Sequence, residues 1–337
     1  MARYKQGKRS FAFTQPPVIA AWASVAGKRE SEGPLGYCFD ECSRDTYFGQ
    51  RTWEQAEKHM QQKALQILLK KAKLSQSDIG LAFSGDLLNQ CIGSSFSLNH
   101  TNIPHFGLYG ACSTMAESLL LASMAVGGGF SDNAVAMTSS HFASSERQYR
   151  FPLGYGGQRT PTAQWTVTGS GAALVVREGD GPQIKACTVG VVTDLGVKDA
   201  NNMGAAMAPA AYETIRTHFQ DLNIGPKDYD LIVTGDLGQT GKEILMQLAD
   251  RDGLSLGGKL TDCGTLIFDN TTQDVHSGGS GCGCSAITLC GYLLPKLQDR
   301  KLKKILFCGT GALLSPTSTQ QGAPIPGICH AVAIERG

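Results

Sequence analysis

The sequence lacks a long apolar run, a block of like charge and an N-terminal secretion signal. No apolar stretch approaches the roughly 18–20 residues needed to span a bilayer, and the opening residues, MARYKQGKRSFAF, contain no apolar signal-peptide core. The formal net charge is only +1, so there is no electrostatic footprint for nucleic acid. We therefore expect a soluble protein that is made in the cytoplasm and binds a small molecule or another protein.

Zinc-site spacing is also missing, although the chain has 11 cysteines. Cys282 and Cys284 flank a single residue in a glycine-rich turn, and neither they nor Cys38 and Cys42 have a second cluster at zinc-finger spacing. In a chain of this length without an export signal, we expect reduced thiols. The residue pattern therefore predicts no metal site and no bound cofactor.

Glycine is abundant, with 41 residues that gather at the ends of short apolar runs. This placement is typical of an α/β protein with many strand-to-helix turns. At 337 residues and 42% hydrophobic content, the chain can bury one large core or two fused ones. Apolar periodicity predicts helices over 52–73, directly after Cys112, over 211–222, from Lys242 and over 285–297. It predicts strands over 17–22, 79–85, 103–109, 133–139, 172–177, 229–235, 304–309 and 331–335.

The two halves of the chain repeat the same order of elements. IGLAFSGDL matches YDLIVTGDL, with Gly85 and Gly235 separated by 150 positions, and NAVAMTSSH and GAALVVREG match KILFCGTGA and CHAVAIERG. Such repetition indicates an internal duplication, with halves over 1–180 and 181–337. Short buried strands alternating with helices predict mostly parallel sheets covered on both faces.

Cys112 occupies a strand-to-helix turn in the stretch FGLYGACSTMAESLLL. A thiol at a helix N-terminus faces unpaired N–H groups and the positive end of the helix dipole, and both favour the thiolate. The residue is therefore a candidate nucleophile. The alternative is a small buried residue in a tight turn.

Two fused α/β halves with this cysteine resemble the thiolase-like fold, in which the sheets pack in a five-layer arrangement. The strings GPLG, GDLLNQ, GACST, SSH with ERQYRFP, YGGQ, VTGSGA, MAPAA, YDLIVTGDL, GGSGCGCSA and GALLSP are similar to the stage V sporulation protein AD family of spore-forming bacteria. The resemblance runs in order from about Gly33 to Glu335.

The resemblance implies a non-enzymatic protein that binds dipicolinic acid (pyridine-2,6-dicarboxylate) and takes part in its transport, with calcium, into the forespore. It also implies a role in spore germination and a homodimer. The implied partners are other stage V sporulation A proteins at the spore inner membrane, with which the protein would associate peripherally. Calcium is expected only together with dipicolinate.

The resemblance to the thiolase-like fold also implies which residues a catalytically active member needs. Condensing enzymes similar to ketoacyl synthase III use a cysteine with a histidine and an asparagine from the second half. Here the histidine's place holds Gly235-Asp236-Leu237-Gly238, and the asparagine's place, near Ser280, offers only serine and glycine. The alternative function is an acyl-thioester condensing enzyme with Cys112 as nucleophile and His141 or His276 recruited to the site. A third reading is an interaction scaffold with a vestigial pocket.

A dipicolinate site needs cationic forks, N–H groups and an apolar slot. Arg147 and Arg150 would share a helix face and could each bind a carboxylate, although a solvated surface or salt bridges with Glu146 would also explain them. Asp86 and Asp236 end equivalent strands. One or both would favour the calcium chelate or contribute to a cation site, or each would cap the following helix. The full set of candidate ligand-binding residues is Cys112, Ser113, Thr114, Asp86, Asn89, Gln90, His141, Arg147, Arg150, Asp236, Ser280 and Gly311.

Overall fold

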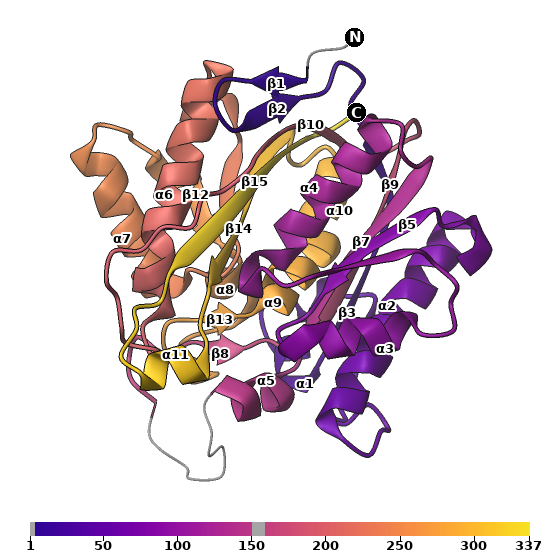
Figure 1. Cartoon of the computed structure of the whole chain (residues 1–337), viewed down its shortest axis with the longest axis horizontal. Coiled ribbons are helices and arrows are strands. Elements are labelled where there is room, and N and C mark those ends of the chain that lie inside the picture. Colours follow the sequence, from indigo (N-terminus) through magenta and orange to yellow (C-terminus); the bar gives the residue numbers. More distant parts are fainter. Residues whose placement is uncertain (1–3, 150–158) are drawn as a thin grey trace.

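The computed structural model describes residues 4–149 and 159–337, and it is an α/β protein, as predicted (Figure 1). The strands are β1 (Lys5–Gln6), β2 (Ser10–Ala12), β3 (Val18–Ala26), β4 (Glu41–Cys42), β5 (Leu81–Gly85), β6 (His105–Leu108), β7 (Asn133–Ser140), β8 (Trp165–Thr166), β9 (Gly169–Val176), β10 (Gln183–Thr188), β11 (Leu231–Thr234), β12 (Leu260–Asp262), β13 (Gly279–Ser280), β14 (Lys304–Ala312) and β15 (Gly327–Glu335). The helices are α1 (Lys28–Ser31), α2 (Trp53–Ala72), α3 (Ile92–Leu98), α4 (Thr114–Gly127), α5 (Phe142–Tyr149), α6 (Met203–Leu222), α7 (Gly238–Arg251), α8 (Cys263–Ile267), α9 (Cys282–Thr288), α10 (Leu294–Gln298) and α11 (Pro316–Gln320).

The strand order is the same in both parts of the sheet. It runs β6-β5-β7-β9-β3 in the first part and β12-β11-β14-β15-β10 in the second, so equivalent strands take equivalent places. In the first part β5 pairs in parallel with β6 and β7, and in the second β11 pairs in parallel with β12 and β14. β9 and β15 then add antiparallel pairs. The repeated order fits the duplication read from the sequence.

The two parts of the sheet meet at a single antiparallel pairing, Gln183 with Val18. The N-terminal hairpin of β1 and β2 lies across this junction, because β2 pairs with β10 of the second part. Residues from the start of the chain therefore complete the sheet of the second half. The boundary at residue 180 stays a prediction.

The helices form layers around the two parts of the sheet (Figure 1). α2 packs on β3 and β9 on one outer side, and α6 packs on β14 and β15 on the other. α4 lies between them and contacts β5 and β7 as well as β14 and β15. The largest apolar cluster accordingly joins Leu119 of α4 to Phe307 of β14. Full burial of each such side chain contributes about 1.5–3 kcal/mol, so the core holds the halves together.

Local sequence explains where the long helices begin. Thr52 caps α2, since its Oγ1 accepts a hydrogen bond from the backbone N of Gln55 at 3.2 Å. The helix ends where Lys73 adopts a left-handed conformation with φ of 56°. α4 instead follows one 3₁₀ turn, Ala111–Ser113, which contains the cysteine.

Two glycines of β14 let this cysteine turn approach the second half. A Cβ atom on Gly309 would lie 2.5 Å from the Cβ of Ala116, and one on Gly311 would lie 2.7 Å from the carbonyl oxygen of Gly110. Real Cβ contacts are not that short, so a larger residue at either place would push the turn away. The backbone contact positions Cys112 where the two halves meet.

Candidate functional site

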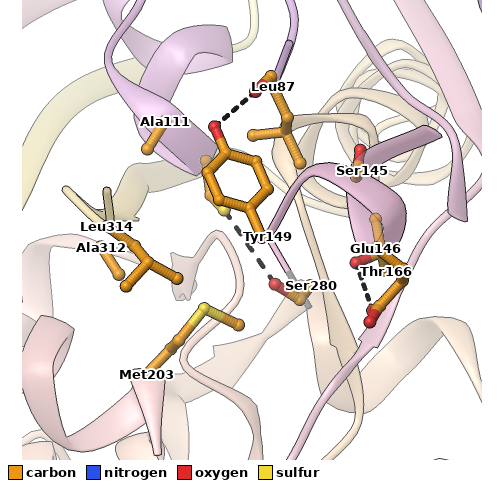
Figure 2. A pocket seen from close by; sticks show the side chains of 11 residues that line it. Leu87, Ala111, Ser145, Glu146, Tyr149, Thr166, Met203, Ser280, Ala312 and Leu314 are labelled. Carbon is orange, nitrogen blue, oxygen red and sulfur yellow. Dashed lines mark hydrogen bonds between the residues drawn. The ribbon is translucent and has the colours of Figure 1, made fainter. Parts of the chain in front are cut away.

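A cavity opens at this junction of the halves, with about 470 Å³ of empty space including the part open to solvent. Figure 2 shows side chains from the cysteine turn, α5 and β13 converging on it. Its lining residues are Leu87, Ala111, Cys112, Ser145, Glu146, Tyr149, Thr166, Met203, Ser280, Ala312 and Leu314.

Cys112 lies on the cavity wall beside residues of the second half. Its Sγ is 4.0 Å from the Oγ of Ser280, which in turn donates to Oδ2 of Asp236 at 3.2 Å. Asp236 also accepts from the backbone N of Gly281 at 2.8 Å and from the Oγ1 of Thr310 at 2.8 Å. The carboxylate is fully buried. These donors hold the carboxylate directly behind Ser280, the lining residue that we call the cavity floor.

Burial governs the protonation of this cluster. Desolvation raises the pKa of Asp236 to about 6, although its hydrogen bonds to Cys112, Gly281 and Thr310 oppose the rise. Desolvation also raises the pKa of the Cys112 thiol well above its usual value, and the Asp236 carboxylate adds to the effect. The predicted thiolate is therefore wrong. The start of α4 offers a favourable dipole, but the loss of water and the neighbouring anion outweigh it.

α5 supplies one wall of the cavity. Tyr149 Oη donates to the carbonyl oxygen of Leu87 at 2.5 Å and lies 2.8 Å from the Oη of Tyr109. Thr166 Oγ1 donates to Glu146 at 2.9 Å. The sequence motifs did not indicate Ser145 and Tyr149, although the helical spacing of this segment could have done so. Residues 145, 146 and 149 share one helix face, so a correct phase for this segment would have selected them.

Arg147 lies on a different face of the same helix. Its guanidinium pairs with Glu54 and lies over the ring of Trp53, 5.2 Å from the ring centroid. With Asn89 and Gln90 it lines a separate surface pocket next to the start of α3. Arg150 lies outside the described residues. The structure therefore does not bring Arg147, Asn89 and Gln90 to the cavity of Cys112, and their role in ligand binding stays a prediction.

The hydroxyls after the cysteine bond to their own turn. Ser113 Oγ donates to the carbonyl of Gly110, and Thr114 Oγ1 donates to the carbonyl of Ala111, each at 2.6 Å. Gly311 packs behind the same turn. These three predicted residues therefore shape the loop around Cys112 and do not line the cavity.

Asp86 accepts backbone hydrogen bonds from the turn that follows it, as a capping residue does. Its fully buried carboxylate accepts from the backbone N of Leu88 at 2.8 Å and of Ser94 at 2.7 Å. This favours the alternative in which the aspartate secures the following helical turn. Asp86 and Asp236 thus follow equivalent strands but lie in different settings, and of the two only Asp236 forms a described hydrogen bond with the side chain of a residue that lines the cavity.

No histidine lines the cavity among the described residues. His141 Nε2 lies 2.8 Å from the carbonyl oxygen of Thr46, and burial lowers its pKa, which favours the neutral ring. His276 is 3.6 Å from Asp274. The amide nitrogen of Gln164 donates to the backbone carbonyl of Asp236 at 2.7 Å, beneath the floor. No described imidazole or carboxamide therefore stands beside the sulfur on the cavity wall.

Residues 4–149 and 159–337 contain no group of three or more acidic, histidine or cysteine side chains arranged to hold a metal ion. In the same part of the chain, no helix has the length and apolar character needed to cross a membrane.

Comparison with solved structures identifies the fold. A single-residue variant of OleA from Xanthomonas campestris superposes with a TM-score of 0.61 at 16% identity, over 96% of this chain and 99% of that one. The 3-oxoacyl-[acyl-carrier-protein] synthase III of Aquifex aeolicus VF5 gives 0.55 at 13% identity, over 95% and 99%. The predicted thiolase-like fold is confirmed.

The family follows from the sequence comparisons. The family model for stage V sporulation protein AD matches residues 7–335. The stage V sporulation protein AD of Bacillus subtilis (strain 168) is 44% identical over 330 residues, which cover 98% of this chain and 97% of that protein. The chain belongs to the stage V sporulation protein AD family.

Asp236→Asn tests the electrostatics of the cavity floor. Because the folded-state pKa of Asp236 is about 6 and that of an unfolded aspartate is near 3.9, the stability linked to its proton is fully present below about pH 4 and is lost as the pH rises through about 6. Between about pH 4 and 7 we expect the unfolding free energy of the wild type to fall by about 2 kcal/mol more than that of Asp236→Asn. Urea denaturation at each pH measures this.

Glu57→Gln is the matched control for that series. Burial raises the pKa of Glu57 to about 8, so the stability linked to its proton is lost as the pH rises to about 8. Glu57→Gln should therefore reduce the pH dependence of the unfolding free energy up to about pH 8, whereas Asp236→Asn should reduce it only up to about pH 6. Identical slopes for the wild type and Asp236→Asn would contradict the assignment.

Proposed function

We propose that this protein binds dipicolinic acid in the cavity at Cys112 and takes part in its uptake into the developing spore, without catalysing a reaction. The resemblance to the stage V sporulation protein AD family implies this ligand and this process, and membership of the family supports the proposal. The observation that carries the proposal is the cavity floor, where Asp236 and Ser280 occupy the places that the resemblance to condensing enzymes gives to histidine and asparagine. An aspartate carries no imidazole N–H and would repel an enolate. The pocket is suited to holding a ligand.

The walls favour a flat ligand with little net negative charge. Leu87, Met203 and Leu314 provide an apolar slot. No lysine or arginine lines the cavity among the described residues, whereas Glu146 does and Asp236 lies behind the floor. No described cation lines the cavity to bind a bare dianion, while a one-to-one calcium chelate of dipicolinate carries no net charge.

Direct coordination by the two aspartates is not part of this proposal. The oxygens of Asp86 and Asp236 already accept hydrogen bonds from protein groups, which leaves them poorly placed as calcium ligands. Calcium enters with the ligand and neutralises its carboxylates.

Calorimetric titration with dipicolinate, with and without equimolar calcium, tests the preference. We expect the chelate to bind at least about tenfold more tightly, since the cavity wall carries a carboxylate and no described cation. Glu146→Gln should narrow the difference by improving the binding of the free dianion. Calcium alone should give no heat of binding, and equal affinities in both titrations would contradict the proposal.

Acylation of the Cys112 thiol tests whether the protein catalyses a reaction. After incubation with an acyl-CoA, intact mass spectrometry should find no acyl group on Cys112, because the raised pKa of the thiol leaves little thiolate to attack a thioester. Treatment with iodoacetamide at high pH, where thiolates form, verifies that the detection works. An acyl adduct that disappears in Cys112→Ala would support the condensing-enzyme alternative instead.

The implied partners are a second copy of the chain and other stage V sporulation A proteins at the spore inner membrane, to which we propose the protein attaches peripherally. Support for the homodimer comes from β6, the end strand of the first part of the sheet, which carries the half-exposed Phe106. An uncovered strand edge with an apolar side chain is suited to pairing with another strand.

Phe106→Asp should convert the homodimer to a monomer, because a charge would be buried at the β6 edge. Light scattering on the purified protein measures the mass. The control is Phe130→Asp, which places the same charge on an exposed residue that follows α4 and should leave the dimer intact. A monomeric wild type would contradict the expected pairing.

A further inference from the structure

We propose that the hydroxyl of Ser145 is the hydrogen-bond donor by which the cavity recognises a carboxylate oxygen of its ligand. The inference rests on the proposed function, and it names a ligand-binding residue on a helix face that the motifs did not indicate. Ser145 belongs to α5, and Figure 2 places its side chain on the cavity wall next to Glu146.

The first observation is that this hydroxyl has no partner among residues 4–149 and 159–337. Ser145 is only 2% exposed, and its Oγ forms no hydrogen bond with any described residue. Its backbone N donates to the carbonyl of His141 at 3.1 Å, so the helix itself is regular here. A buried hydroxyl without a partner costs free energy, and a native protein rarely keeps one without a reason.

The second observation is that the other hydroxyls of the described cavity wall are already engaged. Tyr149 donates to the carbonyl of Leu87, Thr166 donates to Glu146, and Ser280 donates to Asp236. A ligand would have to break one of these bonds to use those groups. Ser145 can donate to a ligand at no such cost.

The third observation is the contrast with the neighbouring serine. Ser144 Oγ donates to Oε2 of Glu57 at 2.8 Å, in the interior beside α2, and Ser144 does not line the cavity. Two consecutive serines of one helix therefore have separate environments. Ser144 bonds to a group in the protein interior, and Ser145 lines the cavity.

The chemistry of a carboxylate fits the orphan hydroxyl. A serine hydroxyl donates one hydrogen bond, and its bond to an ionised oxygen is stronger than to a neutral one. No described lysine or arginine lines the cavity, so the donor from Ser145 and the calcium of the chelate are the groups that would meet the ligand carboxylates.

Ser145→Ala is the test, with binding and stability measured separately. We expect the affinity for calcium dipicolinate to fall about tenfold, because one hydrogen bond to a charged group is lost. The thermal midpoint of the free protein should stay the same or rise, since an unsatisfied buried hydroxyl is removed. Ser145→Thr keeps a hydroxyl and should retain more of the affinity than alanine does.

Ser144→Ala is the matched control one residue away. It should lower the thermal midpoint, because Glu57 loses a donor, and leave the affinity within about twofold of the wild type. The inference is overturned if Ser145→Ala binds like the wild type, or if it loses stability and affinity together. Both results leave the proposed function standing, whereas a wild type that binds neither dipicolinate nor its chelate would refute the proposed function itself.

Discussion

The buried carboxylate of Asp236 is the constraint on which the site depends. A fully buried acidic group is tolerated only when donors surround it, and here the donors are Ser280, the backbone of Gly281 and Thr310. These donors come from the glycine turn before α9 and from β14, so one carboxylate fixes the position of two segments of the second half. The same segments carry the floor of the cavity and approach the cysteine turn of the first half through Gly309 and Gly311.

This arrangement also decides what the sulfur can do. In a condensing enzyme the groups around the cysteine must stabilise negative charge, whereas here the neighbouring carboxylate of Asp236 brings negative charge. The Cys112 thiol consequently has a raised pKa, and its proton stays where Ser280 and Asp236 can interact with it. A fold whose structural neighbours include enzymes thus presents a cavity with a neutral thiol.

The local sequence pattern was sufficient to predict the helices and strands, but it could not predict the surroundings of each side chain. Thr52 as a cap, the strands ending in Gly-Asp-Leu, and the cysteine between β6 and α4 follow from the spacing of apolar, glycine and capping residues, and the structure has them. Burial is a tertiary property, so the sequence could not show that desolvation would outweigh the helix dipole at Cys112. The second difference between prediction and structure concerns α5. The two arginines of this segment favoured residue 147 as a ligand-binding residue, whereas residues 145 and 149, on another face of the helix, line the cavity.

The duplication makes the divergence of the two halves visible. Asp86 and Asp236 follow equivalent strands, and both are fully buried with backbone donors. Asp86 secures its own half through the backbone of Leu88 and Ser94. Asp236 secures the cavity floor. A repeated acidic position therefore secures the turn that leads into α3 in one half and the cavity floor in the other.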